Sequence, residues 1–220
     1  LDYYLDIGLS FFKLGEEAMV DLQKFTLQGS ENSNLRNSHN KIRKLGYIFE
    51  ILPQEQTIKI IDTLKEISDA WLKDKNTREK RFSIGNFDKK YISYFPTAVI
   101  RRQGKIEAFA NIWTTGPKKE LSIDLMRHLP DCVNGIMDFL FTELLLWGQN
   151  QGYEWFNLGM APLSGMADNE LAPMWHKFGT FIFKQGEYFY NFKGLRQYKQ
   201  KFHPVWEPKY LACPNGLALP

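Results

Sequence analysis

Basic and aromatic side chains alternate near the C-terminal end of the chain, from residue 187 to residue 211. The stretch reads EYFYNFKGLRQYKQKFHPVWEPKYL, and only Glu187 and Glu207 oppose its positive charge. Cations on an aromatic-rich frame suit a partner that carries phosphates and stackable rings. The alternative is a helix and a strand whose aromatic residues pack a core and whose lysines lie in water. The candidate binding residues in this stretch are Arg196, Tyr198, Lys199, Lys201 and Trp206.

A second set of candidates lies in the segment SIDLMRHLP, at the end of a strand expected over residues 121–126. Ligands tend to bind at the carboxyl ends of strands in α/β folds. Asp124 can hold an ammonium group or position a hydroxyl there, and Arg127 can grip a phosphate with two parallel hydrogen bonds. A local salt bridge between the two residues is the alternative interpretation.

The segment NLGMAPLSG, residues 157–165, follows the next expected strand. Its glycines and proline indicate a shaped loop that is open to a ligand, with Asn157 and Met160 as candidate binding residues. Ser164 does not lie in the Gly-x-Ser-x-Gly context of a nucleophile elbow. The four histidines show no metal-binding spacing, and the two cysteines form no disulfide framework.

Composition indicates an ordinary globular protein. The chain has 220 residues, of which 44% are hydrophobic and 24% are charged, with a net charge of +3. That charge is too small to indicate nucleic-acid binding unless it is clustered. The longest apolar run, residues 136–147, is too short to span a membrane and contains two acidic residues. No signal peptide is apparent, and the start without Met suggests a piece of a longer protein.

The order of the expected elements predicts an α/β fold with a mixed sheet flanked by helices. Strands are expected over residues 9–14 and 18–27, separated by a turn at 15–17, and over 47–52, 97–102, 105–114, 121–126, 155–160 and 209–212. Helices are expected over 33–45, 54–74, 134–151 (capped by Asn134), 171–184 and 192–201, with a short helix or turn over 87–95. A hairpin, a strand, a buried helix and a further strand form the layout of the acetyltransferase-like (GNAT) fold.

The loop before the buried helix argues against coenzyme A. Enzymes that use this cofactor bind its pyrophosphate with a glycine-rich loop at the helix N-terminus. Residues 127–135 contain one glycine at the end, with Pro130 in the middle and Asp131 where an anion would be repelled. We therefore predict an acetyltransferase-like fold that has no coenzyme A cofactor.

Three passages together resemble one family along nearly the whole chain. They are ELSIDLMRHLPDCVNGIMDFLF, WFNLGMAPLSGM and FYNFKGLRQYKQKFHPVWEPKYLA. They are similar to the cytoplasmic catalytic domain of the lysyl- and alanyl-phosphatidylglycerol synthases, also called multiple peptide resistance factors. The earlier segments FFKLGEEAMVDLQKFTLQG and GYIFEIL fit the same family.

The resemblance implies an organisation and an activity. Residues 1–52 would be the end of a first acetyltransferase-like unit, 53–81 a joining helix and charged loop, and 82–220 a second, catalytic unit. The activity would be transfer of a lysyl or alanyl group from aminoacyl-tRNA to the glycerol hydroxyl of phosphatidylglycerol. This reaction changes membrane surface charge and resistance to cationic antimicrobial peptides. The partners would be aminoacyl-tRNA, phosphatidylglycerol at the cytoplasmic face of the cell membrane, and an N-terminal transmembrane flippase region.

The same resemblance implies functional roles for Asp124, Arg127, Glu187, Lys199 and Lys201. An aminoacyl-tRNA ester is already activated, so its transfer needs no coenzyme A. Either Asp124 or Glu187 would bind the ammonium or help to take the hydroxyl proton. The basic residues, Arg196 among them, would bind the lipid phosphate and the tRNA 3′ end.

Three alternatives to these assignments remain open. One is transfer to a peptidoglycan peptide amine, another is a binding module without catalysis, and the third is proton transfer assisted by the substrate. The choice between lysine and alanine also remains open.

Overall fold

The computed structural model describes residues 2–76, 86–165 and 192–214. The chain divides into two compact units. We call residues 21–156 the central unit, and residues 1–20 together with 157–220 the terminal unit. Asp124 and Arg127 belong to the central unit, whereas the candidates from Asn157 onwards belong to the terminal unit.

The central unit is built on four antiparallel strands in the order β2-β3-β4-β5. Their bounds are Tyr47–Leu52, Thr97–Arg102, Lys105–Thr114 and Glu120–His128. Positive φ angles at Gln103 and Gly104 form the tight turn between β3 and β4, as expected from a Gln-Gly pair between two β-branched and aromatic runs. The hairpin brings β4 against β5, which carries Asp124 and Arg127.

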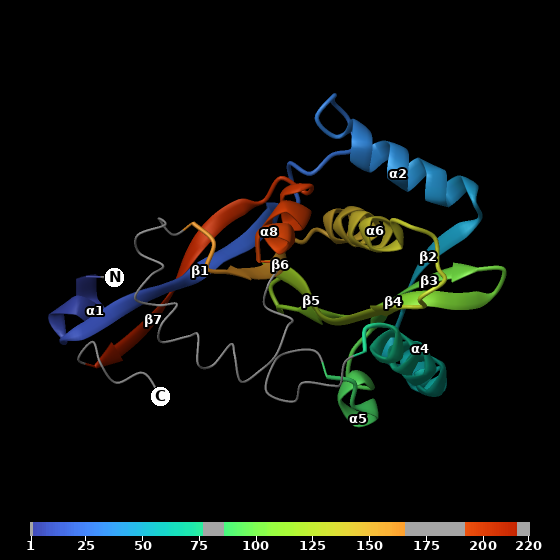
Figure 1. The fold of residues 1–220 in the computed structure, drawn as a ribbon, viewed down its shortest axis with the longest axis horizontal. Helices are drawn as coiled ribbons and strands as arrows, with labels where there is room; N and C mark the ends of the chain where they lie inside the picture. The colour runs from blue at the N-terminus through green and yellow to red at the C-terminus, as the bar shows by residue number, and fades with distance from the viewer. Residues whose placement is uncertain (1, 77–85, 166–191, 215–220) are drawn as a thin grey trace. The chain divides into compact units, whose positions relative to one another are not determined.

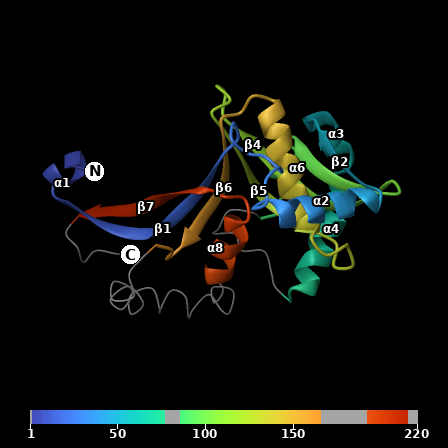
Figure 2. The same ribbon diagram turned by 90° about the horizontal axis from the view of Figure 1, so that it is seen from above.

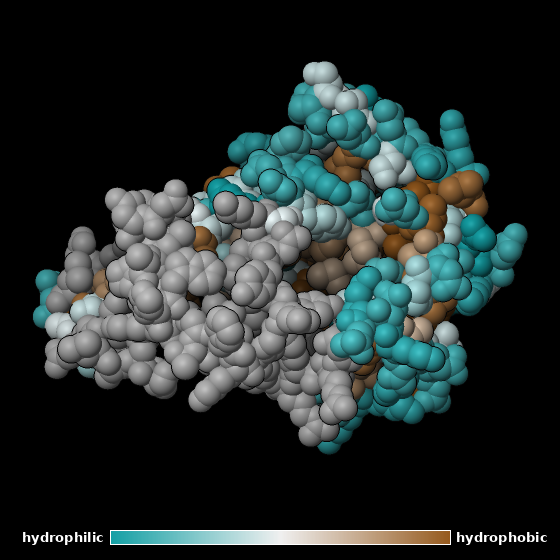
Figure 3. Space-filling model, viewed as in Figure 1, coloured by the Kyte–Doolittle hydropathy of each residue, from teal (hydrophilic) through white to brown (hydrophobic). Residues whose placement is uncertain are grey.

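Helices cover both faces of these strands (Figure 1). On one face lie α2 (Ser33–Lys44) and α6 (Ile136–Asn150); on the other lie α4 (Ile61–Asp74) and α5 (Lys89–Ile92). A core cluster joins α4 and α5 to the sheet through Leu64, Ile67, Ile92, Phe109 and Leu125. Burial of such side chains stabilises the unit by about 1.5–3 kcal/mol each. On the face in Figure 3, hydrophilic side chains cover α2 and the region of α4 and α5, and a hydrophobic area lies between them.

Helix α6 is apolar on nearly all sides because it packs between α2 and the strands. Phe139, Leu140, Leu144 and Leu145 are almost completely buried. The helix ends where predicted, since Gly152 has a positive φ of 81° just beyond the last turn. Its start differs from the prediction, because Gly135 with φ of 92°, and not Asn134, occupies the N-cap position.

The terminal unit consists of α1 (Asp2–Asp6), β1 (Leu9–Asp21), β6 (Trp155–Pro162), α8 (Phe192–Gln200) and β7 (Val205–Pro214). The strands lie in the order β6-β1-β7, and β1 and β7 are antiparallel. Helix α8 lies beside β6 in both ribbon views (Figures 1 and 2). In this arrangement the Lys199 side chain of α8 reaches the backbone of the predicted ligand loop.

Several expected element boundaries are wrong, because β1 ends at Asp21 and β7 spans Val205–Pro214, and two further errors change how the chain is divided into elements. The predicted turn at residues 15–17 does not form, because β1 continues through it with a bulge between Lys13 and Gly15. A Cβ on Gly15 would come within 2.4 Å of the Ala161 carbonyl oxygen, so glycine here permits close strand approach. The helix predicted over residues 54–74 is divided into α3 (Gln54–Lys59) and α4, with non-helical angles at Ile60. The apolar periodicity continues across this break and hides it.

The predicted fold class is confirmed: the protein has an α/β fold, with strands flanked by helices. The predicted domain boundaries at residues 52 and 81 stay a prediction. The helix expected over residues 171–184 lies outside the described residues. Across the described part of the chain, no helix is both long enough and apolar enough to cross a membrane.

Candidate active site

A β-bulge in β5 positions the acidic candidate of the central unit. Ala110 pairs with Met126 and Ile112 pairs with Ile123, so one residue of β4, Asn111, lies opposite two residues of β5, Asp124 and Leu125. The fully buried side chain of Asn111 stabilises the bulge, because its Oδ1 accepts a hydrogen bond from the Leu125 amide at 2.6 Å. Bulges re-aim side chains next to functional sites.

The bulge sets the direction of Asp124. Leu125 packs in the core cluster below α4 and α5, and Asp124 also reaches α5, where it accepts a 2.9 Å hydrogen bond from the Tyr91 hydroxyl. Successive residues of a regular strand point to opposite faces, so only the bulge allows both side chains to reach the same helices. It also brings Arg127, three residues further on, to that face.

The environment of Asp124 favours its protonated form. Burial raises the pKa of Asp124, and the hydrogen bond from Tyr91 and the positive charge of Arg127 only partly oppose this effect. Burial together with the hydrogen bond to the carboxylate raises the pKa of Tyr91 to about 12, so Tyr91 is a neutral donor at physiological pH. A carboxyl group with a raised pKa is suited to exchanging a proton.

Arg127 is held by an aromatic ring and a backbone carbonyl. Its guanidinium lies 4.2 Å from the centroid of the Trp71 ring in α4, and its Nη1 donates a 2.9 Å hydrogen bond to the Met126 carbonyl. Stacking of this kind fixes the plane of the guanidinium, a group whose donors match the geometry of carboxylates and phosphates. The predicted pair of Asp124 and Arg127 therefore lies on one face of β5, against α4 and α5.

Lys199 is the most deeply buried of the basic candidates in the terminal unit. Only 7% of its surface is exposed, and its Nζ donates hydrogen bonds of 2.9 Å to the carbonyl oxygens of Gly159 and Met160 in β6. Burial lowers the pKa of Lys199 to about 8, although the negative charge of Glu17 works in the opposite direction. A lysine in this range exchanges protons near physiological pH, unlike an exposed lysine.

Arg196 is held by a carboxylate and a ring in the same unit. It forms a salt bridge with Glu16 of β1, and its guanidinium lies 4.1 Å from the centroid of the Trp206 ring. Burial by itself would raise the pKa of Glu16, but hydrogen bonds from Arg196 and Lys13 outweigh it and lower that pKa. This arrangement fixes Arg196 in place and reduces its freedom to grip a ligand.

The other candidates of the terminal unit border these two cations. Lys201 is exposed, and its Nζ lies 4.7 Å above the ring of Tyr198, which itself packs edge-on against Phe202. Asn157 has a local role, since its Oδ1 accepts a 2.7 Å hydrogen bond from the Gly159 amide. Met160 contributes its carbonyl oxygen to Lys199. Trp206 Nε1 donates to Gln200.

The structure thus gathers the sequence candidates into two groups, one in each unit. Glu187 lies outside the described residues. Three neighbours were missed from the sequence: Tyr91, Asn111 and Glu16. No local motif marks them, because their roles depend on contacts far apart in the chain. Within residues 2–76, 86–165 and 192–214 no group of three His, Cys, Asp or Glu side chains could hold a metal ion.

Comparison with known proteins identifies the family of this chain. A family model described as phosphatidylglycerol lysyltransferase, C-terminal, matches residues 1–213. A phosphatidylglycerol lysyltransferase of Bacillus subtilis is 42% identical over 217 residues, which cover 98% of this chain and 25% of that protein. The chain therefore spans about a quarter of the length of the curated relatives it matches.

Two solved structures are similar over nearly the whole chain. The C-terminal domain of a protein described as a lysylphosphatidylglycerol synthetase from Agrobacterium fabrum aligns with a TM-score of 0.82 and 50% identity, covering 98% of this chain and 65% of that chain. L-PGS from Bacillus licheniformis aligns with a TM-score of 0.79 and 37% identity, covering 100% and 66%. Because the family model matches almost every residue, this chain belongs to the family of phosphatidylglycerol lysyltransferase C-terminal domains.

Proposed function

We propose that this chain is the catalytic domain of an enzyme that transfers an aminoacyl group from aminoacyl-tRNA to phosphatidylglycerol. The observation that carries the proposal is the match of residues 1–213 to the lysyltransferase family. The geometry supports it, because the chain holds a half-buried carboxyl group with a raised pKa and a buried lysine with a lowered pKa. Perturbed ionisable groups of this kind are typical of active sites.

The proposed reaction forms one ester bond and breaks another. The glycerol hydroxyl oxygen attacks the aminoacyl carbonyl carbon, and the 3′-terminal ribose oxygen of the tRNA leaves. The hydroxyl proton passes to a base and then to the leaving oxygen, so the reaction needs no coenzyme A. Asp124 is suited to hold this proton or to bind the α-ammonium, and Glu187 remains the alternative for either role.

We assign a different role to each basic side chain. Arg127 stacks on Trp71 with its donors fixed in one plane, which suits a lipid or RNA phosphate. Lys201 is exposed beside Tyr198 and suits the tRNA 3′ end, where an aromatic ring can stack on a base. Arg196 is already engaged by Glu16. We therefore assign Arg196 to shaping the site and not to gripping a phosphate.

The proposed setting is the cytoplasmic face of the cell membrane. There the full-length protein would carry an N-terminal transmembrane flippase region, and its product would lower the negative charge of the membrane surface. Each aminoacyl group adds a positive charge to an anionic headgroup, which weakens the attraction of cationic antimicrobial peptides.

The test is a transfer assay with the full-length protein that carries this chain, radiolabelled aminoacyl-tRNA and phosphatidylglycerol vesicles. Label should appear in the lipid extract, and RNase pretreatment of the tRNA should abolish it. We expect Asp124→Asn and Lys199→Met each to lower the rate by about 100-fold or more. The matched controls, Asp69→Asn and Lys59→Met, alter exposed side chains and should keep wild-type rates.

Two results would contradict the proposal. Label that stays in the aqueous phase and attaches to a peptide amine would replace the lipid acceptor. Full activity in both variants would show that neither Asp124 nor Lys199 takes part in the transfer. Far-ultraviolet circular dichroism of each variant checks that a lost rate is not a lost fold.

A further inference from the structure

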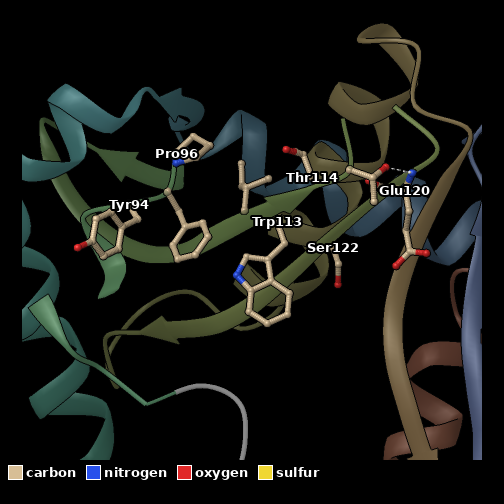
Figure 4. Close-up of a pocket in the computed structure, with 9 residues that line it drawn as sticks. Tyr94, Pro96, Trp113, Thr114, Glu120 and Ser122 are labelled. Atoms are coloured by element: carbon tan, nitrogen blue, oxygen red, sulfur yellow. Dashed lines mark hydrogen bonds between the residues drawn. The ribbon is translucent and has the colours of Figure 1, made fainter. Parts of the chain in front are cut away.

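Two features of the central unit have no part in the proposed transfer as described so far. One is a pocket of about 400 Å³ between the turn that follows α5 and the strands β4 and β5, with Trp113 on one wall (Figure 4). Phe95 also lines it, and its ring centroid lies 5.0 Å from that of Tyr91, which donates a hydrogen bond to Asp124. This pocket therefore belongs to the candidate site. The other feature is a basic surface on different elements.

The basic surface is formed by the C-terminal end of α2, by β2 and by the turn between β3 and β4. Both ribbon views place the end of α2 and this turn at the same end of the central unit (Figures 1 and 2). The strand ladder holds the segments together, because Tyr47 pairs with Arg102 and Arg102 pairs with Lys105. The guanidinium of Arg102 also lies 5.1 Å from the centroid of the Tyr47 ring. We call residues 41–52 and 101–107 the basic corner.

The basic corner carries more positive charge than its own contacts neutralise. It holds six basic residues and two acidic ones, Glu50 and Glu107. Both acids are engaged within the corner: Glu50 accepts a 2.8 Å hydrogen bond from Arg101, and Glu107 accepts a 2.9 Å hydrogen bond from the Tyr47 hydroxyl. Four exposed cations have no ion-pair partner within the described part of the chain: Lys41, Arg43, Lys44 and Lys105.

Two aliphatic side chains are exposed among these cations. Leu45 is 47% exposed and Ile48 is 59% exposed, directly after the last turn of α2. In Figure 3, hydrophobic side chains reach the surface near this end of α2, between hydrophilic ones. Cations in the last turn of a helix complement its dipole, but the dipole does not explain Leu45 and Ile48, which lie beyond the helix. Exposed aliphatic groups beside unpaired cations are typical of an interaction surface.

The combination favours a lipid bilayer over a nucleic acid or a second copy of the chain. Cations that attract anionic headgroups, together with aliphatic side chains that enter the acyl boundary, are typical of surfaces that bind membranes. RNA-binding surfaces instead offer exposed rings on which bases stack, whereas Tyr47 is buried and Phe49 is half-buried. A second copy that docked through the same surface would bring like charges together.

From these observations we infer that the basic corner docks the central unit on an anionic lipid bilayer, with the cations of α2 among the headgroups and Leu45 and Ile48 at the acyl boundary. Lys105 contributes less, because it lines a pocket together with the exposed acid Asp131. The docking depends on the surface charge of the bilayer and not on recognition of one headgroup. The inference goes beyond the proposed function, since it concerns how the central unit lies on a membrane and not which group is transferred.

The experiment measures binding of the 220-residue chain to vesicles that contain no phosphatidylglycerol. One set contains phosphatidylcholine and phosphatidylserine, and the other contains phosphatidylcholine alone. We expect the wild type to bind the anionic vesicles at least about tenfold more tightly, since each cation near an anionic surface contributes about fivefold. The combined variant Lys41→Gln, Arg43→Gln and Lys44→Gln should lose about tenfold or more of this affinity.

A control variant removes the same charge elsewhere in the central unit. Lys59→Gln, Lys73→Gln and Lys90→Gln together alter exposed lysines outside the basic corner and should keep the affinity within about twofold. Leu45→Ser with Ile48→Ser keeps the charge, but it should weaken binding by about tenfold because less apolar surface is buried. Far-ultraviolet circular dichroism checks that each variant is folded.

Three results would overturn the inference. Equal losses in the α2 variant and its control, or no loss in either, would show that the basic corner does not dock on the bilayer. Unchanged vesicle binding by the α2 variant together with weaker binding to tRNA would assign the corner to RNA. Dimers of the wild type in analytical ultracentrifugation that the serine variant abolishes would assign it to a second copy.

Failure of the proposed function gives a different result. With phosphatidylglycerol dispersed in detergent, the full-length protein that carries the α2 variant should transfer label within about twofold of wild type, because no bilayer is needed there. A wild type that transfers no label in this assay, but binds anionic vesicles through the basic corner, would overturn the proposed transfer and leave the docking inference standing.

Discussion

Each unit holds one ionisable side chain that the sequence singled out: Asp124 is half-buried in the central unit, and Lys199 is buried in the terminal unit. Their hydrogen-bond partners are of opposite kinds. In the central unit, Asp124 receives a hydrogen bond from Tyr91 and feels the charge of Arg127. In the terminal unit, Lys199 donates to two neutral carbonyl groups of β6. Burial nevertheless moves both pKa values toward the neutral form, upward for the carboxyl group and down to about 8 for the ammonium.

This difference shows which polar contacts serve stability. The Glu16–Arg196 pair lies in the same unit as Lys199, but there the hydrogen bonds outweigh burial and lower the pKa of Glu16. A carboxylate with a lowered pKa stabilises the fold, whereas a charge that burial neutralises costs folding energy. Costly groups that are retained are expected where function requires them.

The largest expected effect concerns Lys199 and pH. Its pKa of about 8 lies below the ordinary value of 10.5, so the unfolded chain binds more protons than the folded chain between these values. Stability attributable to Lys199 therefore rises with pH through this window, by about 3 kcal/mol at 1.36 kcal/mol per pKa unit. Chemical denaturation of wild type and Lys199→Met at pH 7.5 and pH 10 measures the change. A constant difference between the two proteins would show that Lys199 is not desolvated.

A smaller effect of opposite sign is expected for Glu16. Glu16→Gln should lower the free energy of unfolding at pH 7 by about 1 kcal/mol, discounted for the partial exposure of Arg196. Because the folded pKa of Glu16 is lowered, this contribution is present above its ordinary value of 4.5 and disappears as the pH falls through the folded pKa. Urea titrations at pH 7 and pH 3.5 test it, with Glu207→Gln on the exposed part of β7 as control. A loss that persists at the lower pH would assign the effect to packing.

The smallest expected change in stability is that of Asp124→Asn, within about 0.5 kcal/mol of wild type at pH 7, because the amide keeps the shape of the half-buried carboxyl group. The raised folded pKa of Asp124 means that the wild type gains on the variant as the pH falls toward that pKa. Thermal unfolding at pH 7 and pH 4.5 measures this gain. Strong destabilisation at pH 7 would indicate that Asp124 stabilises the fold, as Glu16 does.

The activity of a further variant, Tyr91→Phe, sharpens the comparison. Loss of the phenol donor removes one of the interactions that lower the pKa of Asp124, so that pKa should rise further. If ionised Asp124 is the active form, the acidic limb of the pH–rate profile should shift upward, with the rate at its plateau reduced only a few-fold. An unshifted profile would separate Tyr91 from the titration of Asp124.

Much of the fold was accessible from the sequence. Residues 47–52, 97–102 and 105–114 were predicted with the observed bounds, because β-branched and aromatic runs ended at Gly or Pro. The buried helix followed from its continuous apolar character. The bulge at Gly15 was mistaken for a turn, because Gly in a strand and Gly in a turn look alike until the neighbouring strand is known.

The site was accessible only in part. Asp124, Arg127 and Lys199 were identified from the sequence, and Tyr91 and Glu16 were not. Tyr91 lies 33 residues before Asp124, and Glu16 lies 180 residues before Arg196. Such partners are chosen by strand register and helix packing, which no local pattern encodes. For the same reason the burial of Lys199, in a stretch that looked solvated, could not be foreseen.

The bulge in β5 inverts the alternation of side chains between the two faces of the strand from Asp124 onwards. An acid and an arginine three residues apart occupy opposite faces of a regular strand. The extra residue of the bulge brings both side chains to the same face. In a related strand with the same two residues but no bulge, the acid and the arginine would lie on opposite faces. In a relative with one residue fewer between them, Asp-x-Arg on a regular strand, the two side chains would again share one face.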